Sequence, residues 1–183
     1  MIILKFILRV VAIIVLVPVL WLAVWYIQSF FPHIDELHAI SERGQLSMVN
    51  NKELFYKYAV AAESKEGIRK SATGMAYWSL VFSKNRPKNN LSWHFDNLFW
   101  YLASFIHFNE QDIFGIWINC AFYGCGRGLN EVSRIYYDKG LSELSKKELA
   151  GIAAFVTNPP LYKPGSKKSE DRIKQIIDKS NNS

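Results

Sequence analysis

The N-terminal part of the chain carries one unbroken apolar run. Residues 10–27 contain no charged side chain, and a helix needs about 20 such residues to cross a bilayer. Pro18 lies inside the run, which membrane helices tolerate. Tryptophan and tyrosine gather near its distal end, as they do at a membrane interface. The pattern predicts a transmembrane anchor over residues 1–31.

Basic residues precede this run and suggest its orientation. Lys5 and Arg9 come before it, and positive charges next to a membrane helix stay on the cytoplasmic side. We therefore expect a single-pass protein of the cytoplasmic (inner) membrane whose domain faces outside, toward the periplasm. A cleaved signal peptide is the alternative, but this run is longer and lacks a small-residue cleavage site.

The remaining chain shows mostly helical spacing of its apolar residues. Pro32 marks the exit from the anchor, and we expect a stalk over residues 32–51, a helical domain over residues 52–178 and a polar tail over residues 179–183. Ser145 with Glu148 reads as a capping box. The fold class expected is mainly α.

Two stretches leave alternatives open. Residues 77–82 fit a strand, although their flanks read as helix. Residues 95–106 have a helical period and are apolar nearly all round. A helix of that kind lies in a core or touches lipid.

Composition adds little about function. Half the residues are hydrophobic and the formal net charge is +6, which excludes a disordered chain. The charge suits anionic lipid, an anionic substrate or nucleic acid equally well, and no further pattern supports nucleic-acid binding. Cys120 and Cys125 fit either a disulfide or two partly buried thiols, and we favour the thiols. No cluster resembles a metal site.

Several segments from residue 113 to residue 177 match one family in order. "DIFGIWIN" resembles its I-L-x-x-Y-x-N helix, with Asn119 at the asparagine, and "FYGCGRGLNEVSRIYYDKGLSEL" is similar to its glycine-rich turn and following helix. "LSKKELAGIAAFVTNPPLYKP" resembles a helix closed by Asn-Pro and Tyr-x-Pro, and Arg172 falls at an arginine of the last helix. The chain thus resembles the membrane-anchored, monofunctional peptidoglycan glycosyltransferases of family 51.

This resemblance implies a lysozyme-like helical domain that polymerises lipid-linked disaccharide at the outer face of the membrane. Such chemistry needs a carboxylate base to activate the acceptor hydroxyl. It also needs cations, or a divalent metal such as Mg²⁺ or Mn²⁺ if the protein is active, to stabilise the leaving diphosphate.

The N-terminal motifs of the family are altered here. Glu63 in "AVAAESKEGI" falls at the general base of the motif Glu-Asp-x-x-Phe-x-x-His, but the Asp, Phe and His are replaced. "GMAYWSLVFSKN" aligns with Gly-x-Ser-Thr-Ile-Thr-Gln-Gln and the following Lys-Asn. It keeps Gly74, Lys84 and Asn85, while most of the polar side chains between them become apolar.

The third and fourth motifs have lost cations. "WHFDN" aligns with Arg-Lys-x-x-Glu, so Trp93 and His94 replace the basic pair, and Asp96 lies one place from the glutamate. Glu110 replaces a lysine of the fourth motif. Losing one essential group commonly costs a factor of about 100 to 10,000 in rate, so we expect impaired catalysis.

Three functional hypotheses follow. The first is an impaired relative that binds lipid-linked precursor or cell-wall proteins. The second is a divergent active enzyme that uses Glu63 with Asp96 or Glu66. The third is a scaffold that locates an envelope-spanning machine at the cell wall. The candidate site residues are Glu63 and Asp96 for catalysis and Lys84, Asn85, Asn119 and Arg172 for substrate binding. The cations available to compensate are Arg69, Lys70, Lys84 and Arg86.

Overall fold

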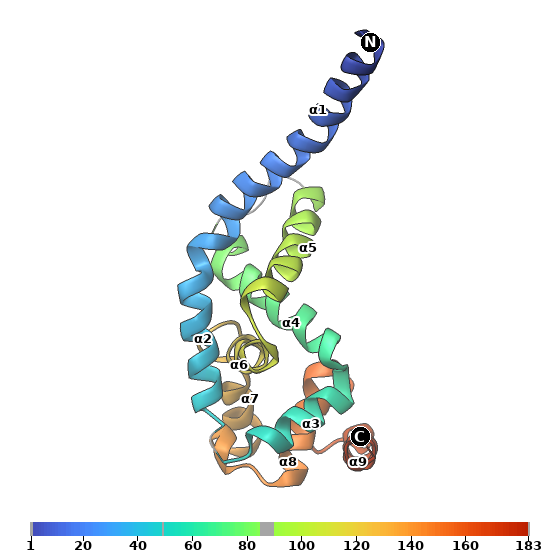
Figure 1. Ribbon diagram of the computed structural model, residues 1–183. Coiled ribbons are helices and arrows are strands. Elements are labelled where there is room, and N and C mark those ends of the chain that lie inside the picture. Colours follow the sequence, from blue (N-terminus) through green and yellow to red (C-terminus); the bar gives the residue numbers. More distant parts are fainter. Residues whose placement is uncertain (1, 49, 85–89, 183) are drawn as a thin grey trace. The chain divides into compact units, whose positions relative to one another are not determined.

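A computed structural model describes residues 2–48, 50–84 and 90–182. The chain forms two compact units, Met1–Asp35 and Glu36–Ser183. Every regular element of the described residues is helical (Figure 1). The expected fold class, mainly α with an N-terminal apolar helix and a lysozyme-like helical domain, is confirmed.

The first unit is built around α1 (Ile2–Trp25), which continues as a π-helical turn, Tyr26–Phe30, and a 3₁₀ turn, Phe31–His33. Apolar side chains along α1 are exposed all round, and Pro18 sits inside the helix. Among the described residues, the helix that begins in this unit is the one long and apolar enough to cross a membrane.

The structure differs from the stalk expected over residues 32–51. From residue 36 onward this stretch lies in the second unit, and most of it forms α2 (Ile34–Leu46). Leu37, Ile40 and Gly44 are buried because they recur at helical spacing on one face. The seven polar residues of the helix hid this narrow apolar face in the sequence.

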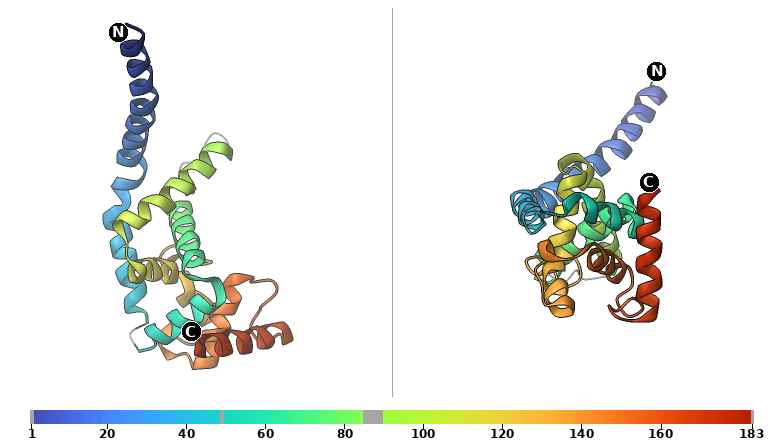
Figure 2. Two further views of the ribbon diagram at one scale, coloured as in Figure 1. Left: turned by 45° about the vertical axis from the view of Figure 1, so that its right-hand side comes forward. Right: turned by 90° about the horizontal axis from the view of Figure 1, so that it is seen from below.

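The centre of the second unit is α6 (Glu110–Cys120), which lies between α2 and α4 (Lys65–Tyr77) in both ribbon views (Figures 1 and 2). Gly44 and Gly115 let α2 and α6 approach closely, since a Cβ on Gly115 would lie 2.3 Å from the Ser41 carbonyl oxygen. Trp117 in α6 is fully buried and stacks on Phe114.

The second unit also contains α3 (Lys52–Glu63), α7 (Gly128–Tyr137), a 3₁₀ turn (Leu141–Glu143), α8 (Lys146–Thr157) and α9 (Lys167–Asn181). Helix α8 packs against both α3 and α9 (Figure 2). The predicted capping box of α8 is confirmed: the Ser145 hydroxyl accepts from the Glu148 N–H, and the Glu148 carboxylate accepts from the Ser145 N–H.

The polar tail expected from residue 179 is helical instead. Helix α9 runs to Asn181, and the Lys179 ammonium donates to the Ala61 carbonyl oxygen at 3.0 Å. That carbonyl belongs to the last turn of α3, where carbonyl groups lack partners within the helix. The Lys179 ammonium satisfies one of these carbonyl groups, and this hydrogen bond attaches the last turn of α9 to the end of α3.

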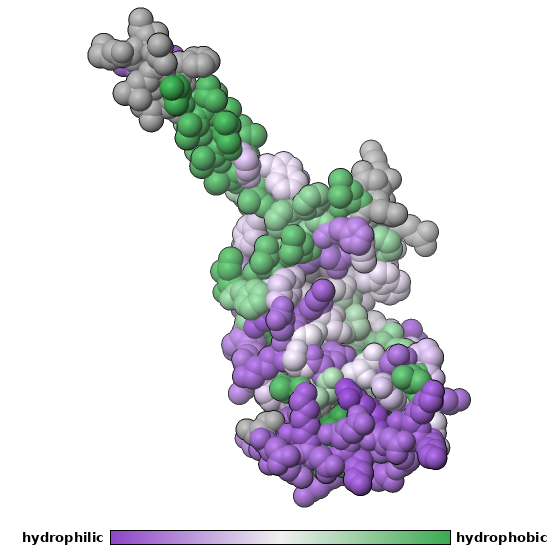
Figure 3. Space-filling view, turned by 90° about the vertical axis from the view of Figure 1, so that its right-hand side faces the viewer, coloured by the Kyte–Doolittle hydropathy of each residue, from purple (hydrophilic) through white to green (hydrophobic). Residues whose placement is uncertain are grey.

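Helices α4 and α5 (Asn90–His107) pack against each other and carry the two ambiguous stretches. The strand alternative for residues 77–82 is wrong: α4 continues as a π-helical turn, η3 (Trp78–Phe82). In α5, Trp100 is fully buried, whereas an apolar stripe on the other face is exposed and visible in Figure 3. The stripe consists of Leu91, Phe95, Leu98, Leu102, Phe105 and Ile106.

Candidate functional site

A cleft of about 840 Å³ opens beside the packed pair α4 and α5. Residues that line it come from two of the altered motifs and from the glycine-rich turn: Gly74 and Ser79 from the second motif, Trp93 and Asn97 from the third, and Gly124 from the turn. The fold therefore assembles in one place what the sequence carries in separate segments. The full lining is Glu66, Lys70, Ser71, Gly74, Met75, Trp78, Ser79, Trp93, His94, Asn97, Leu98, Tyr101, Cys120, Phe122 and Gly124.

The π-helical turn η3 places side chains at this cleft. A π-helical turn inserts an extra residue relative to an α-helix and frequently occurs at functional sites. Here it follows α4 directly, so Trp78 and Ser79 both line the cleft, with Trp78 53% exposed. The Ser79 hydroxyl accepts from the Cys125 N–H at 3.3 Å, which ties η3 to the glycine-rich turn.

The glycine-rich turn forms another wall of the cleft. Phe122, Gly124 and Gly126 all have positive φ, a conformation that glycine adopts without strain and phenylalanine rarely adopts. This tight path leads the chain from α6 into α7. It leaves the Phe122 side chain 47% exposed at the cleft.

A disulfide joins the two ends of this turn and corrects the favoured interpretation of two free thiols. Cys120, the last residue of α6, is bonded to Cys125. The sequence alone could not decide this, because pairing requires the turn to bring two Cβ atoms within reach. The bond closes a short loop whose residues line the cleft.

Replacing both cysteines by alanine is expected to lower the free energy of unfolding by about 2 kcal/mol. A disulfide that closes a loop this short lowers the conformational entropy of the unfolded chain, which contributes about 2 kcal/mol to stability. Thermal melts of the full-length protein with and without reductant would measure it. Reductant should lower the melting temperature of the wild type to that of the double variant and leave the variant unchanged. Equal melting temperatures in all four samples would contradict the prediction.

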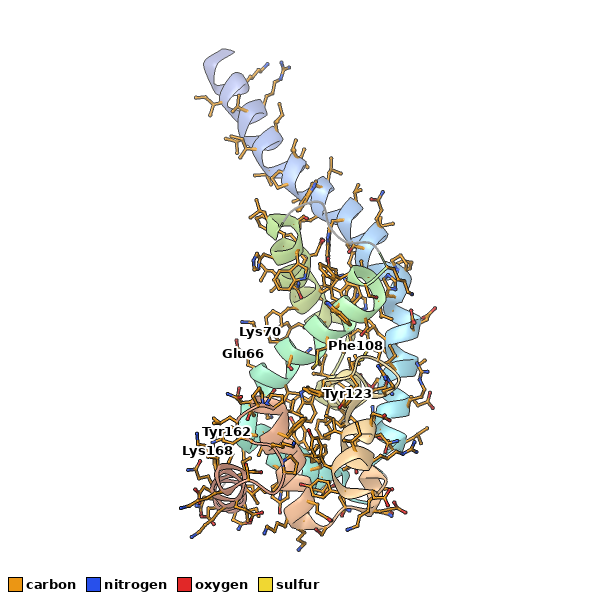
Figure 4. The ribbon with its side chains drawn as sticks, turned by 180° about the vertical axis from the view of Figure 1, so that it is seen from behind. Glu66, Lys70, Phe108, Tyr123, Tyr162 and Lys168 are labelled. Atoms are coloured by element: carbon orange, nitrogen blue, oxygen red, sulfur yellow. A yellow bond between two sulfur atoms is a disulfide. The ribbon has the colours of Figure 1, made fainter. Side chains whose placement is uncertain are left out.

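Two charged side chains of α4, Glu66 and Lys70, line the cleft. Glu66 and Lys70 are exposed and stand one turn apart on the same face of α4 (Figure 4). The Tyr101 hydroxyl approaches the Glu66 carboxylate at 3.5 Å. Lys70 is the cation among the described residues that line the cleft, so little positive charge faces it.

A second cavity of about 410 Å³ shares Glu66 and Tyr101 with the cleft. Glu110, which replaces a lysine of the resembled motif, lies here and accepts from Lys65 at 2.9 Å and from the Tyr56 hydroxyl at 2.8 Å. Its hydrogen bonds to Lys65 and Tyr56 lower the pKa of Glu110. The Lys65 cation is thus engaged by Glu110 at this second cavity.

The candidate base Glu63 ends α3 and does not line the cleft. It is half-buried, and burial raises the pKa of its carboxyl above the usual value. A raised pKa is what a general base near neutral pH needs. Glu63 lies, however, beside the first turn of α4, because a Cβ on Gly67 would lie 3.4 Å from the Glu63 Cβ.

The second catalytic candidate, Asp96, lies near the far end of α4. Its carboxylate accepts from the Tyr77 hydroxyl at 3.0 Å. Between Gly67, beside Glu63, and Tyr77, helix α4 rises by about 15 Å. A base must come within about 3 Å of the proton that it removes. The structure therefore does not bring Glu63 and Asp96 together, and Glu66 is the carboxylate that it places at the cleft.

The predicted substrate-binding residues are also dispersed. Lys84 is exposed in the turn after η3 and does not line the cleft, and Asn85 lies outside the described residues. The Asn119 side chain accepts from the Gly126 N–H at 2.7 Å. Asn119 thereby holds the glycine-rich turn in shape rather than pointing a free amide oxygen at a ligand.

Arg172 lies in α9 and contacts α3. Its guanidinium donates to the Ala62 carbonyl oxygen at 3.1 Å and to the Gln175 side chain at 3.3 Å, and it lies 5.9 Å from the centre of the Tyr162 ring. Arg172 therefore contacts the residue that precedes Glu63 in the chain, at the end of α3. These contacts hold Arg172 against α3, while its buried Nε has no hydrogen-bond partner among the described residues.

No group of three or more His, Cys, Asp or Glu side chains that could hold a metal ion occurs in the part of the chain that the structure describes. Sequence reasoning missed Trp78, Met75 and Phe122 as lining residues of the cleft. The available signal in the sequence was the presence of aromatic residues in these segments, Trp78 in the second motif and Phe122 in the glycine-rich turn.

The model of the transglycosylase family matches residues 74–181, more than half of the chain. A curated relative, the biosynthetic peptidoglycan transglycosylase of Haemophilus influenzae, is 29% identical over 111 residues, which are 55% of this chain and 41% of the relative. The chain thus matches about two fifths of that relative's length. No solved structure matches the chain.

Proposed function

The chain belongs to the transglycosylase family, and from this premise we propose that it is a membrane-anchored protein that binds lipid-linked disaccharide precursor with little or no turnover. The observation that carries the proposal is the lining of the 840 Å³ cleft. Positions that resemble the sugar- and diphosphate-binding motifs of the family meet there, but they present mostly aromatic and apolar side chains. The cleft is retained while its charge is not.

The loss of cations supports impaired catalysis. A leaving diphosphate needs positive charge placed beside it. Trp93 and His94 stand at the cleft where the resembled motif has a basic pair, and Glu110 is held by Lys65 in the second cavity. The Lys70 ammonium stands one turn from the Glu66 carboxylate, which reduces its net field.

The exposed stripe of α5 supports binding at a membrane. Its six apolar side chains lie at helical spacing on one face, with Leu98 and Phe105 48% and 56% exposed. Contiguous apolar surface on a soluble domain marks a partner or a lipid contact. The apolar helix α1 supplies the second membrane contact. The disulfide supports a domain that faces the oxidising, outer side of the membrane.

The test is to incubate the full-length protein in detergent with fluorescent lipid-linked disaccharide-pentapeptide and Mg²⁺ or Mn²⁺, and to measure both polymer and binding. Glu63→Gln, Glu66→Gln and the control Glu53→Gln run in parallel; Glu53 is an exposed carboxylate in the first turn of α3. We expect saturable binding by all four proteins. Any polymer should form at least about 10,000-fold more slowly than with an active transglycosylase.

Each alternative result has a clear meaning. Polymer from the wild type that disappears in Glu63→Gln or Glu66→Gln, but not in Glu53→Gln, would show an active enzyme and identify its base. Absence of both polymer and binding would contradict the proposal and favour a role in contacting cell-wall proteins.

A further inference from the structure

Much of the cleft surface is apolar. Met75, Trp78, Trp93, Leu98 and Phe122 supply large apolar surfaces, and the disulfide at Cys120 adds a sulfur wall. Its volume of about 840 Å³ lies within the range of small-molecule sites, about 300–1,000 Å³, which are mostly apolar. A hydrocarbon ligand that covers this lining removes apolar surface from water, which favours binding.

Two polar side chains in the middle of the lining already have partners within the protein. The Asn97 side chain donates to the Trp93 carbonyl oxygen at 3.0 Å, and the Ser79 hydroxyl accepts from the Cys125 N–H. Both groups thus already serve the protein's own backbone. Each sugar hydroxyl buried here without a partner would cost about 1–3 kcal/mol. Hydrocarbon carries no such cost.

The cleft opens onto the exposed stripe of α5. Leu98 lines the cleft and also lies in the middle of the stripe. From Leu91 to Ile106 the stripe extends along about 22 Å of helix. A chain that leaves the cleft at Leu98 can therefore continue along an apolar surface instead of entering water. The charged pair Glu66 and Lys70 stands at the cleft as well, so a polar end group can remain solvated there.

We infer that the cleft binds the polyprenyl chain of the lipid-linked precursor, and that this chain rather than the disaccharide diphosphate gives the protein its affinity. The inference rests on the proposed function and names the part of the ligand that the protein recognises. At the cleft, Trp93 stands where the third motif has a basic residue, and this exchange improves the site for hydrocarbon.

A cleft-filling variant tests this without weakening the fold. Gly74 lines the cleft from within α4, and a Cβ there would lie 3.5 Å from the Asn97 amide oxygen, an ordinary contact. In Gly74→Leu the side chain fills the cleft, while the loss of a helical glycine favours the helix. Gly67→Ala is the control for replacing a helical glycine of α4, because its nearest atoms lie at 3.4 Å and it does not line the cleft.

The full-length protein in lipid nanodiscs is photolabelled with a diazirine-bearing polyprenyl monophosphate, and the labelled residues are mapped by mass spectrometry. We expect labels on Met75, Trp78 or Leu98 in the wild type and in Gly67→Ala, with at least a tenfold loss in Gly74→Leu. Unlabelled whole precursor should compete, whereas soluble disaccharide-pentapeptide without lipid should not.

Other results overturn the inference in distinguishable ways. Competition by the soluble disaccharide, or precursor binding that Gly74→Leu leaves unchanged, would overturn the lipid-chain site and leave the proposed function standing. Equal labelling by a diazirine fatty acid would make the occupant an ordinary membrane lipid. Failure of both the polyprenyl probe and the whole precursor to bind would overturn the inference and the proposed function together.

Discussion

Replacing Arg69 by alanine is expected to lower the free energy of unfolding by about 3 kcal/mol, because hydrogen bonds from a charged donor to buried acceptors contribute about 1.5–3 kcal/mol each. The Arg69 side chain is buried in α4, and its guanidinium donates to the carbonyl oxygens of Ser104 and Phe108 at 3.0 and 3.3 Å. It also lies 4.4 Å from the centre of the Phe105 ring. Phe108 follows the last residue of α5, and the Ser104 carbonyl oxygen also accepts from the Phe108 N–H at 3.0 Å.

Two control variants distinguish the planar hydrogen-bonding geometry of the guanidinium from its positive charge. Arg69→Lys keeps the charge but cannot serve several acceptors in one plane, so it should fall between the wild type and Arg69→Ala. Lys70→Ala, at the neighbouring exposed position, should change stability by less than about 0.5 kcal/mol. Thermal and chemical unfolding of the full-length protein would measure these differences. A loss below about 1 kcal/mol in Arg69→Ala would show that the α5 carbonyls do not depend on Arg69.

Replacing Gly115 by alanine is expected to destabilise the domain by about 3 kcal/mol, at the upper end of typical overpacking costs. The new Cβ would lie 2.3 Å from the Ser41 carbonyl oxygen, and backbone atoms cannot move aside as a flexible side chain can. Helices α2 and α6 would have to separate. The reciprocal change, Gly44→Ala, places a Cβ 1.9 Å from the Gly115 carbonyl oxygen and should have an effect of the same size.

Gly67→Ala is again the matched control, because it also adds one methyl group to a helical glycine. Its nearest atoms would lie at 3.4 Å, so relief of glycine's conformational entropy should leave the protein unchanged or stabilise it by up to about 1 kcal/mol. Melting curves of the three variants would decide the matter. Equal melting temperatures for Gly115→Ala and Gly67→Ala would contradict the close packing of α2 on α6.

Arg69 also bears on the hypothesis of a divergent active enzyme. That hypothesis requires cations to replace those lost from the motifs. Arg69 is committed to the end of α5, and Lys65 to Glu110. Of the described candidates, Lys70 remains at the cleft and Lys84 is exposed away from it. The spatial arrangement thus favours binding over turnover for a reason that the sequence alone did not contain.

The sequence by itself determined the features that depend on local pattern. The apolar run of α1, the helical spacing of residues 95–106 and the Ser145–Glu148 capping box each involve residues within a few turns of one another. The family could also be predicted, because its C-terminal motifs follow one another in order over a single stretch that the family match covers.

Only the tertiary structure decided which of these residues meet. Glu63 and Asp96 belong to motifs that act together in the resembled family, yet they lie beside Gly67 and Tyr77, between which α4 rises by about 15 Å. Asn119 and Arg172 bind the protein's own backbone, and the narrow apolar face of α2 gains meaning only against Gly115. The physical reason is that a side chain's role depends on what lies within a few ångströms of it. Across segments distant in the sequence, the packing of helices sets that neighbourhood.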